Sequence, residues 1–178
     1  LSALLDYEWI RRDWYSSEID EKHFGIQEFI SLTLVANDCV GKGVELGRVW
    51  RVKVPMRLGR DALCCDLIIN TYTEGSNPIR IRLINVHLNP LPISHNLRPR
   101  QLAITSSYLR AADCGLIAGD FSPVFPEDNS LIADNGLEDA WLHFYPGKRG
   151  WTWGVKGNKS FPPGRFDMFA QWGLGRRG

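Results

Sequence analysis

The sequence lacks a strong charge of either sign and any long apolar run. Its 21 lysines and arginines are balanced by 20 aspartates and glutamates, which leaves a net charge of +1. The strongly basic field that favours bulk binding to nucleic acid is therefore excluded, although a local basic cleft is not. A membrane-spanning helix needs roughly eighteen or more consecutive apolar residues. Because no such run is present, we expect no membrane span.

Cysteine is also scarce, and none of the four cysteines forms a C-x-x-C pair. They are Cys39, Cys64, Cys65 and Cys114. This spacing does not match that of a zinc site. We expect buried free thiols, which favour a reducing and therefore intracellular compartment, cytoplasmic or nuclear.

Apolar and aromatic residues are abundant: 44% of the chain is apolar and seven residues are tryptophan. This composition argues against disorder. No linker or low-complexity segment divides the 178 residues. We therefore expect residues 1–178 to form a single domain, and the protein to be a monomer.

The hydrophobic periodicity alternates between helix and strand. Helices are predicted at 1–12, with Leu4 and Trp9 on its apolar face, and at 99–112. Strands are predicted at 31–36, 48–56, 62–72, 79–88 and 115–119. The last two strands and the helix between them form a strand–helix–strand unit, which indicates a layered α/β fold.

Two predicted strands end in a side chain capable of acid–base chemistry. His87 closes the strand INVHL, and Asp120 closes GLIAGD; a third candidate, Asp167, follows the loop SFPPGRF. Strand ends form the mouth where ligands bind in sheets covered by helices. Each residue also has a structural explanation: a hydrogen-bonded histidine, a Gly-Asp turn, or a surface pair of Arg165 with Asp167. The spacing alone predicts no more than an α/β domain with a possible acidic site.

Three motifs occur in the order found in one known family. INVHL resembles the N-x-H-L strand, IAGDF resembles the G-D-F-N strand, and GRFD resembles the R-x-D segment of the endonuclease/exonuclease/phosphatase (DNase I-like) superfamily. The stretches RPRQL, LEDAW and GWTWG resemble its fungal branch, loosely that of tyrosyl-DNA phosphodiesterase 2 relatives. The resemblance extends from about residue 17 to residue 168.

The resemblance implies a four-layer α/β sandwich that hydrolyses phosphate esters with Mg²⁺ or Mn²⁺. The implied substrate is a DNA end, a nucleotide or another phosphoester. His87 would hydrogen-bond a phosphoryl oxygen, and Asp120 would orient or deprotonate the attacking water and contribute weakly to metal binding. Asp167 would orient a further histidine. The implied substrate-binding residues are Asn85, Ser122 and Arg165.

The sequence departs from the family pattern in ways that bear on catalysis. Ser122 stands where the G-D-F-N strand has asparagine, and the closing S-D-H motif is absent. The metal-binding glutamate of the Q-E strand has no clear equivalent. Glu28 in Gln27-Glu28-Phe29 is a candidate, but a solvated surface carboxylate is the preferred interpretation.

We therefore expect a domain that is incomplete at both termini and whose activity is weakened or lost. The alternatives are a degenerate domain that binds phosphate or a partner, and a fragment of a longer gene product.

The segment WLHFYPGKRGWTWG has two interpretations. Its tryptophans could form a platform on which nucleic-acid bases stack. Packing in the core and in strand pairs is the preferred interpretation. Similarly, Arg98 and Arg100 at the start of the helix at 99–112 could contact phosphate, but solvated side chains are the expected outcome.

Overall fold

A computed structural model describes residues 2–18, 30–56, 59–71, 75–89, 96–156 and 162–175. Six strands form one sheet in the order β3-β4-β5-β6-β8-β7. They are β3 (Val44–Lys53), β4 (Asp61–Ile69), β5 (Ile79–His87), β6 (Cys114–Asp120), β8 (Asp167–Trp172) and β7 (Glu138–Asp139). A separate pair of strands comprises β1 (Trp14–Ser16) and β2 (Leu34–Ala36).

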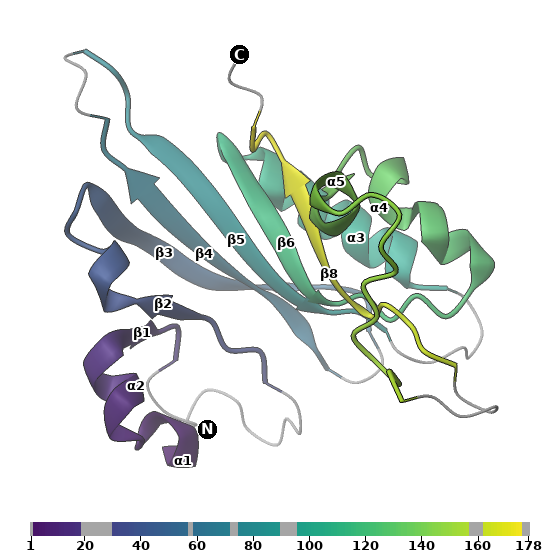
Figure 1. Ribbon diagram of the computed structural model, residues 1–178. Coiled ribbons are helices and arrows are strands. Elements are labelled where there is room, and N and C mark those ends of the chain that lie inside the picture. Colours follow the sequence, from purple (N-terminus) through teal and green to yellow (C-terminus); the bar gives the residue numbers. More distant parts are fainter. Residues whose placement is uncertain are drawn as a thin grey trace.

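The helices of the described residues are short except for one. They are α1 (Ser2–Leu5), α2 (Glu8–Asp13), α3 (Arg98–Arg110), α4 (Leu131–Asp134) and α5 (Ala140–Phe144), with 3₁₀ turns at Asn37–Cys39 and Pro126–Ser130. In this part of the chain no helix has the length and apolarity to cross a membrane. Figure 1 shows α3 and α4 together behind the sheet, whereas α1, α2, β1 and β2 lie near β3 at the opposite side of the molecule.

The topology contains the predicted strand–helix–strand unit. β5 and β6 are parallel neighbours joined through α3, while the pairs β3–β4, β4–β5, β6–β8 and β7–β8 are antiparallel. Parallel neighbours need a crossover connection, which α3 supplies. The predicted mixed α/β fold is confirmed.

Alternation along the strands places a core between the sheet and α3. Ile84 and Val86 of β5 and Ile117 of β6 pack with Leu102 and Leu109 of α3, and all five side chains are buried. Successive side chains of a strand point to opposite faces, so the intervening residues face away from α3.

The segment before β3 lies against that second face. The side-chain amide of Asn85 donates to the carbonyl oxygen of Leu32 at 2.9 Å. Arg51 donates to the carbonyl oxygen of Ser31 at 2.8 Å and forms ion pairs with Glu18 and Asp61, each at 2.6 Å. These polar contacts fix the segment to β3, β4 and β5.

The helix predicted at 1–12 is wrong in its continuity and in its apolar face. Tyr7 has extended backbone angles, with φ −62° and ψ 127°, and separates α1 from α2. Because this break changes the helical phase, Trp9 is 48% exposed and Ile10 is the buried residue of α2.

The cysteines differ in exposure, which permits a chemical test. Cys64, Cys65 and Cys114 are buried, as predicted, whereas the prediction is wrong for the exposed Cys39; all four thiols are free. Burial raises the pKa of the Cys64 thiol to about 12, so it carries almost no reactive thiolate at neutral pH.

We expect a thiol reagent to modify Cys39 rapidly in the native protein and all four cysteines only after denaturation, measured by intact mass. Rapid native labelling of Cys64 would contradict the buried β4 core.

Candidate active site

The three predicted catalytic residues lie on three neighbouring strands. His87 ends β5 and is paired in register with Asp120 at the end of β6, which is paired with Asp167 at the start of β8. The Nε2 atom of His87 is 3.5 Å from Oδ2 of Asp120. The parallel run of β5 and β6 explains this proximity, because the carboxyl ends of parallel strands meet at one edge.

Asp120 is held in place by the turn that follows it. The backbone N–H and the hydroxyl of Ser122 both donate to Oδ1 of Asp120, each at 2.7 Å. Ser122 is buried and has a φ of 43°, in the left-handed region that L-residues other than asparagine and aspartate rarely adopt. Ser122 therefore anchors the Asp120 carboxylate.

The backbone of Asp167 is fixed by Thr152 of the tryptophan-rich segment. The Thr152 hydroxyl accepts hydrogen bonds from the backbone N–H groups of Phe166 and Asp167, at 3.1 and 3.0 Å. The Asp167 side chain itself is exposed. The W-T-W motif thus contributes to the site through its central threonine, a role that the sequence reasoning did not assign.

Arg60 is a further residue of this region that the sequence reasoning missed. It is buried, and together with Ile30, Ser31, Asp61 and His87 it lines a cavity of about 70 Å³. Its positive charge acts on both His87 and Asp120. β4 is antiparallel to β5, so a residue just before β4 lies beside the end of β5. The sequence places Arg60 directly before a predicted strand. Its proximity to His87 follows only once that strand is known to pair with β5.

The surroundings of His87 favour its neutral form. Desolvation is the largest influence and lowers the pKa of His87 below its ordinary value, and the charge of Arg60 lowers it further. The carboxylates of Asp120 and Asp167 act in the opposite direction but do not outweigh these effects. At neutral pH, His87 is therefore a hydrogen-bonding group without a full charge.

A titration of His87 by NMR tests this balance of charges. We expect a midpoint below the ordinary histidine pKa of 6.5, moved upward in Arg60→Gln and downward in Asp120→Asn. Between the lowered pKa of His87 in the folded chain and its ordinary value of 6.5 in the unfolded chain, the unfolded chain binds more protons at this residue. His87 therefore stabilises the fold above pH 6.5, and this contribution is lost as the pH falls through that window. A midpoint above 6.5 would show that the carboxylates dominate.

The predicted substrate-binding residues have other polar partners. Asn85 donates its amide hydrogen to Leu32, and Ser122 binds Asp120. Arg165 forms a bidentate ion pair with Asp139, one branch being 2.8 Å from Nη1 to Oδ1. The suggested Arg165–Asp167 surface pair is therefore wrong, while phosphate binding by these three residues stays a prediction. Glu28 lies outside the described residues.

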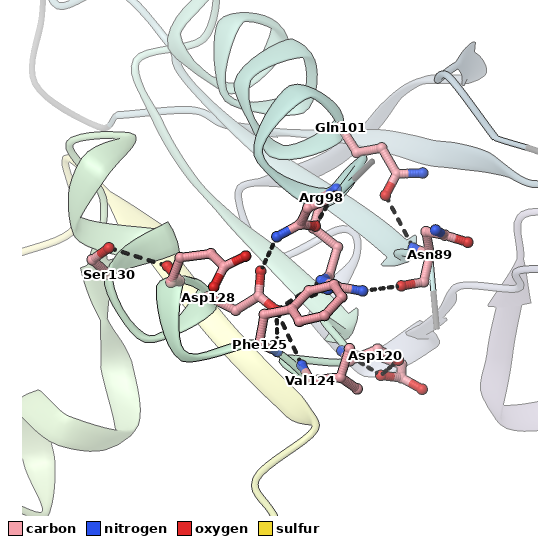
Figure 2. A network of polar contacts seen from close by, with 11 residues as sticks. Asn89, Arg98, Gln101, Asp120, Val124, Phe125, Asp128 and Ser130 are labelled. Carbon is pink, nitrogen blue, oxygen red and sulfur yellow. Dashed lines mark hydrogen bonds and ion pairs between the residues drawn. The ribbon is translucent and has the colours of Figure 1, made fainter. Parts of the chain in front are cut away.

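A buried polar network joins the loops that follow His87 and Asp120 (Figure 2). Arg98 and Asp128 form an ion pair at 2.9 Å, and both side chains are fully buried. Arg98 also donates to the carbonyl oxygen of Asn89 at 2.7 Å, while the N–H groups of Val124 and Phe125 donate to Asp128 at 3.0 and 2.8 Å. The expectation that Arg98 is solvated is wrong, because its charge is compensated inside the fold; Arg100 is exposed as expected.

The tryptophan-rich segment does not pack in the core. Trp141, Trp151 and Trp153 are all exposed, so the predicted packing in the core is wrong for them. Their contacts are local: Trp141 lies 4.5 Å from Tyr145 between ring centroids, and Trp153 stacks on Phe166 at 5.2 Å. Trp153 also forms an isolated β-bridge with Gly164. The Trp151 ring is covered in part by the Arg149 guanidinium, which lies 4.8 Å from its centroid.

The described residues do not fit a divalent metal site by themselves. Among them, no group of three histidine, cysteine, aspartate or glutamate side chains could hold a metal ion. Asp120 is a carboxylate ligand candidate, but Oδ1 already accepts two hydrogen bonds from Ser122. Mg²⁺ is usually held by one or two carboxylates, with waters and substrate phosphate completing its octahedron, so Asp120 alone supplies part of such a set.

No protein-family model matches the sequence, and no curated protein sequence matches it. The folded chain, however, is similar to solved structures. D. rerio TDP2 in complex with a single-strand DNA product has a TM-score of 0.65 and 14% identity, covering 96% of this chain and 65% of that one. C. elegans TDP2 has a TM-score of 0.61 and 16% identity over 92% of this chain and 49% of that one. This chain thus spans less than two thirds of the length of these structures. The chain therefore has a DNase I-like fold, which it shares with these TDP2 structures.

Proposed function

We propose that this chain carries a phosphoester-hydrolysing site with reduced activity. The observation that supports it is the register His87–Asp120–Asp167 across β5, β6 and β8. It brings a neutral imidazole and two carboxylates to one edge of the sheet. This is the edge at which an α/β fold binds its ligands.

Each residue has a defined task in the proposal. The Arg60 guanidinium and the His87 imidazole stabilise the negative charge that develops on the phosphoryl oxygens. The Asp120 carboxylate orients the attacking water and accepts its proton, with Oδ1 fixed by Ser122 and Oδ2 directed toward His87. Asp167 adds negative charge beside His87. In this superfamily Mg²⁺ or Mn²⁺ supplies Lewis-acid chemistry, and the lack of a fitting ligand set among the described residues is the reason to expect weak turnover.

The second candidate is a domain that binds phosphate without hydrolysing it. It is favoured by Ser122 at the asparagine position and by the lack of a three-ligand group among the residues described. In both candidates residues 1–178 form a single partial domain, and the ligand is a phosphoester such as a DNA end or a nucleotide.

A hydrolysis assay distinguishes the two candidates. The chain is incubated with bis-p-nitrophenyl phosphate in Mg²⁺, in Mn²⁺ and in EDTA, together with His87→Ala. His143→Ala is the matched control, because His143 is exposed and pairs with Glu138 away from Asp120. Turnover that is lost in His87→Ala and kept in the control supports hydrolysis at this site. The absence of turnover from folded protein, with a shift of the His87 NMR signal on adding phosphate, supports the binding domain.

A further inference from the structure

A second groove, lined by both charged and apolar side chains, lies at the opposite ends of the strands from His87 and Asp120. It has a volume of about 910 Å³ and is lined by three arginines, Arg48, Arg80 and Arg82, with Trp50, Asp66 and Asp113 among the remaining residues. None of these residues belongs to the site at the end of β5. The three arginines come from β3 and β5, two strands that are separated by β4.

A β-bulge presents Arg48 to this groove. Leu46 pairs with Leu67 and Val49 pairs with Cys65, so Gly47 and Arg48 together face the single residue Asp66. A Cβ atom on Gly47 would lie 2.8 Å from Cβ of Asp66, so glycine alone fits at this position. Bulges commonly redirect a side chain, and here the redirected side chain is an arginine.

Arg82 forms a rigid floor for the groove. Its Nε and Nη2 atoms donate to the two carboxylate oxygens of Asp66 at 2.7 and 2.8 Å, and Nη1 donates to the carbonyl oxygen of Tyr108 at 2.7 Å. Its guanidinium carbon is 4.5 Å from the centroid of the Trp50 ring. These interactions hold Arg82 in place at the floor of the groove, and the Asp66 carboxylate neutralises its charge.

Arg48 and Arg80 differ from Arg82 because their charges face solvent. Both residues are exposed, and within the described ranges neither guanidinium takes part in a hydrogen bond or ion pair. The nearby carboxylate of Asp113 already accepts the backbone N–H of Arg80 at 2.7 Å. Three arginines against the two carboxylates Asp66 and Asp113 leave the groove with a net positive charge.

The spacing and geometry of these arginines suit phosphate. Strands two positions apart in a sheet are separated by about 10 Å, which two arginine side chains can bridge. The planar guanidinium donates two parallel hydrogen bonds to a phosphate group. Ile68 and Pro78 add an apolar rim for the rest of a ligand. We propose that this groove binds the phosphate groups of a phosphate ester, separately from the site at His87.

Fluorescence anisotropy with a labelled single-stranded DNA oligonucleotide tests the proposal. We expect the double variant Arg48→Gln/Arg80→Gln to bind at least tenfold more weakly, and its plot of log Kd against log salt to lose about 1.4 of slope, roughly 0.7 for each phosphate contact. Arg11→Gln, at an exposed arginine on α2, is the matched control and should bind like the wild type. Both variants should keep the wild-type Tm, because the altered side chains are exposed.

Competition and a second variant complete the test. Pyrophosphate or AMP that displaces the oligonucleotide identifies a small phosphate ligand, whereas displacement by unlabelled oligonucleotide alone identifies a nucleic-acid strand. Either result supports the groove when the displaced binding is weakened in the double variant and kept in Arg11→Gln. Equal affinity of the double variant and the wild type, the absence of binding by any probe, or loss of binding in His87→Ala with the double variant unaffected would overturn it. Hydrolysis at His87 is measured separately, so the two proposals can fail independently.

Discussion

Replacing Arg98 with alanine is expected to lower the free energy of unfolding by about 3–5 kcal/mol, because it breaks a fully buried ion pair. Asp128 would remain inside the fold with its charge no longer compensated. For a domain of this size the loss corresponds to a fall in Tm of roughly 10 °C. Thermal unfolding followed by circular dichroism measures both quantities.

The network around the pair explains why the loss should be so large. Asp128 also accepts hydrogen bonds from Asn96 at 2.7 Å and from the N–H groups of Val124 and Phe125. Burial on its own would raise the pKa of Asp128, but the hydrogen bonds from Arg98, Asn96 and Phe125 outweigh it and hold the pKa below its ordinary value. Asp128 therefore stabilises the fold above the ordinary aspartate pKa, and this contribution is lost as the pH falls through the lower folded value.

A double-mutant cycle separates the pair from the rest of the network. Arg98→Met, Asp128→Asn and their combination should show a favourable coupling energy, since the two side chains touch. Arg12→Ala is the comparison, because the Arg12–Asp13 pair is exposed and should contribute nothing measurable. Additive effects of Arg98→Met and Asp128→Asn would mean that the two charges do not stabilise each other.

The strands β5 and β6 and the residues at their ends, His87 and Asp120, were predictable because the signals are local. β5 and β6 each carry enough apolar and β-branched residues to be recognised, and the helix between them makes the two strands parallel. Parallel neighbours end at the same edge of the sheet. The sequence therefore makes His87 and Asp120 candidates for one site, and the pairing of β5 with β6 places them together.

The remaining features depend on contacts between distant parts of the chain. Arg60 reaches His87 only because β4 returns antiparallel beside β5. Arg98 and Asp128 are separated by 30 positions, and arginine is rarely buried without a partner, so sequence alone favoured a solvated side chain. The groove lined by Arg48 depends on a bulge opposite Asp66, and a bulge leaves little trace in the hydrophobic pattern.

The tryptophans of the tryptophan-rich segment were predicted to be buried but are exposed, whereas Arg98 was predicted to be exposed but is buried. An aromatic segment favours burial on composition, but Trp151 and Trp153 lie on a loop that Thr152 joins to the start of β8 by a hydrogen bond to the N–H of Asp167. The backbone contacts of Thr152 fix the path of the chain into Asp167. This contact does not require the flanking tryptophan rings to be buried. Composition alone therefore overestimated how deeply Trp151 and Trp153 are buried.

If the chain hydrolyses phosphoesters, Asp120→Asn is expected to reduce kcat/KM by about a hundredfold or more. Asparagine has the shape of aspartate and keeps an oxygen that can accept the two hydrogen bonds from Ser122, so the fold and the turn should persist. It lacks the negative charge that accepts a proton from water. The matched control is Asp6→Asn, at an exposed carboxylate near the N-terminus.

Ser122→Ala tests whether the anchor of Asp120 matters as well as its charge. The variant removes the hydroxyl that donates to Oδ1 but keeps the backbone N–H bond, so the carboxylate stays charged and is held less tightly. We expect a smaller loss than in Asp120→Asn, about tenfold and mainly in kcat, because alignment with the attacking water is weakened. If Ser122→Ala has the kcat of the wild type while Asp120→Asn is inactive, catalysis depends on the charge of Asp120 and not on its anchor. If Asp120→Asn keeps full turnover, the hydrolysis does not occur at this edge of the sheet.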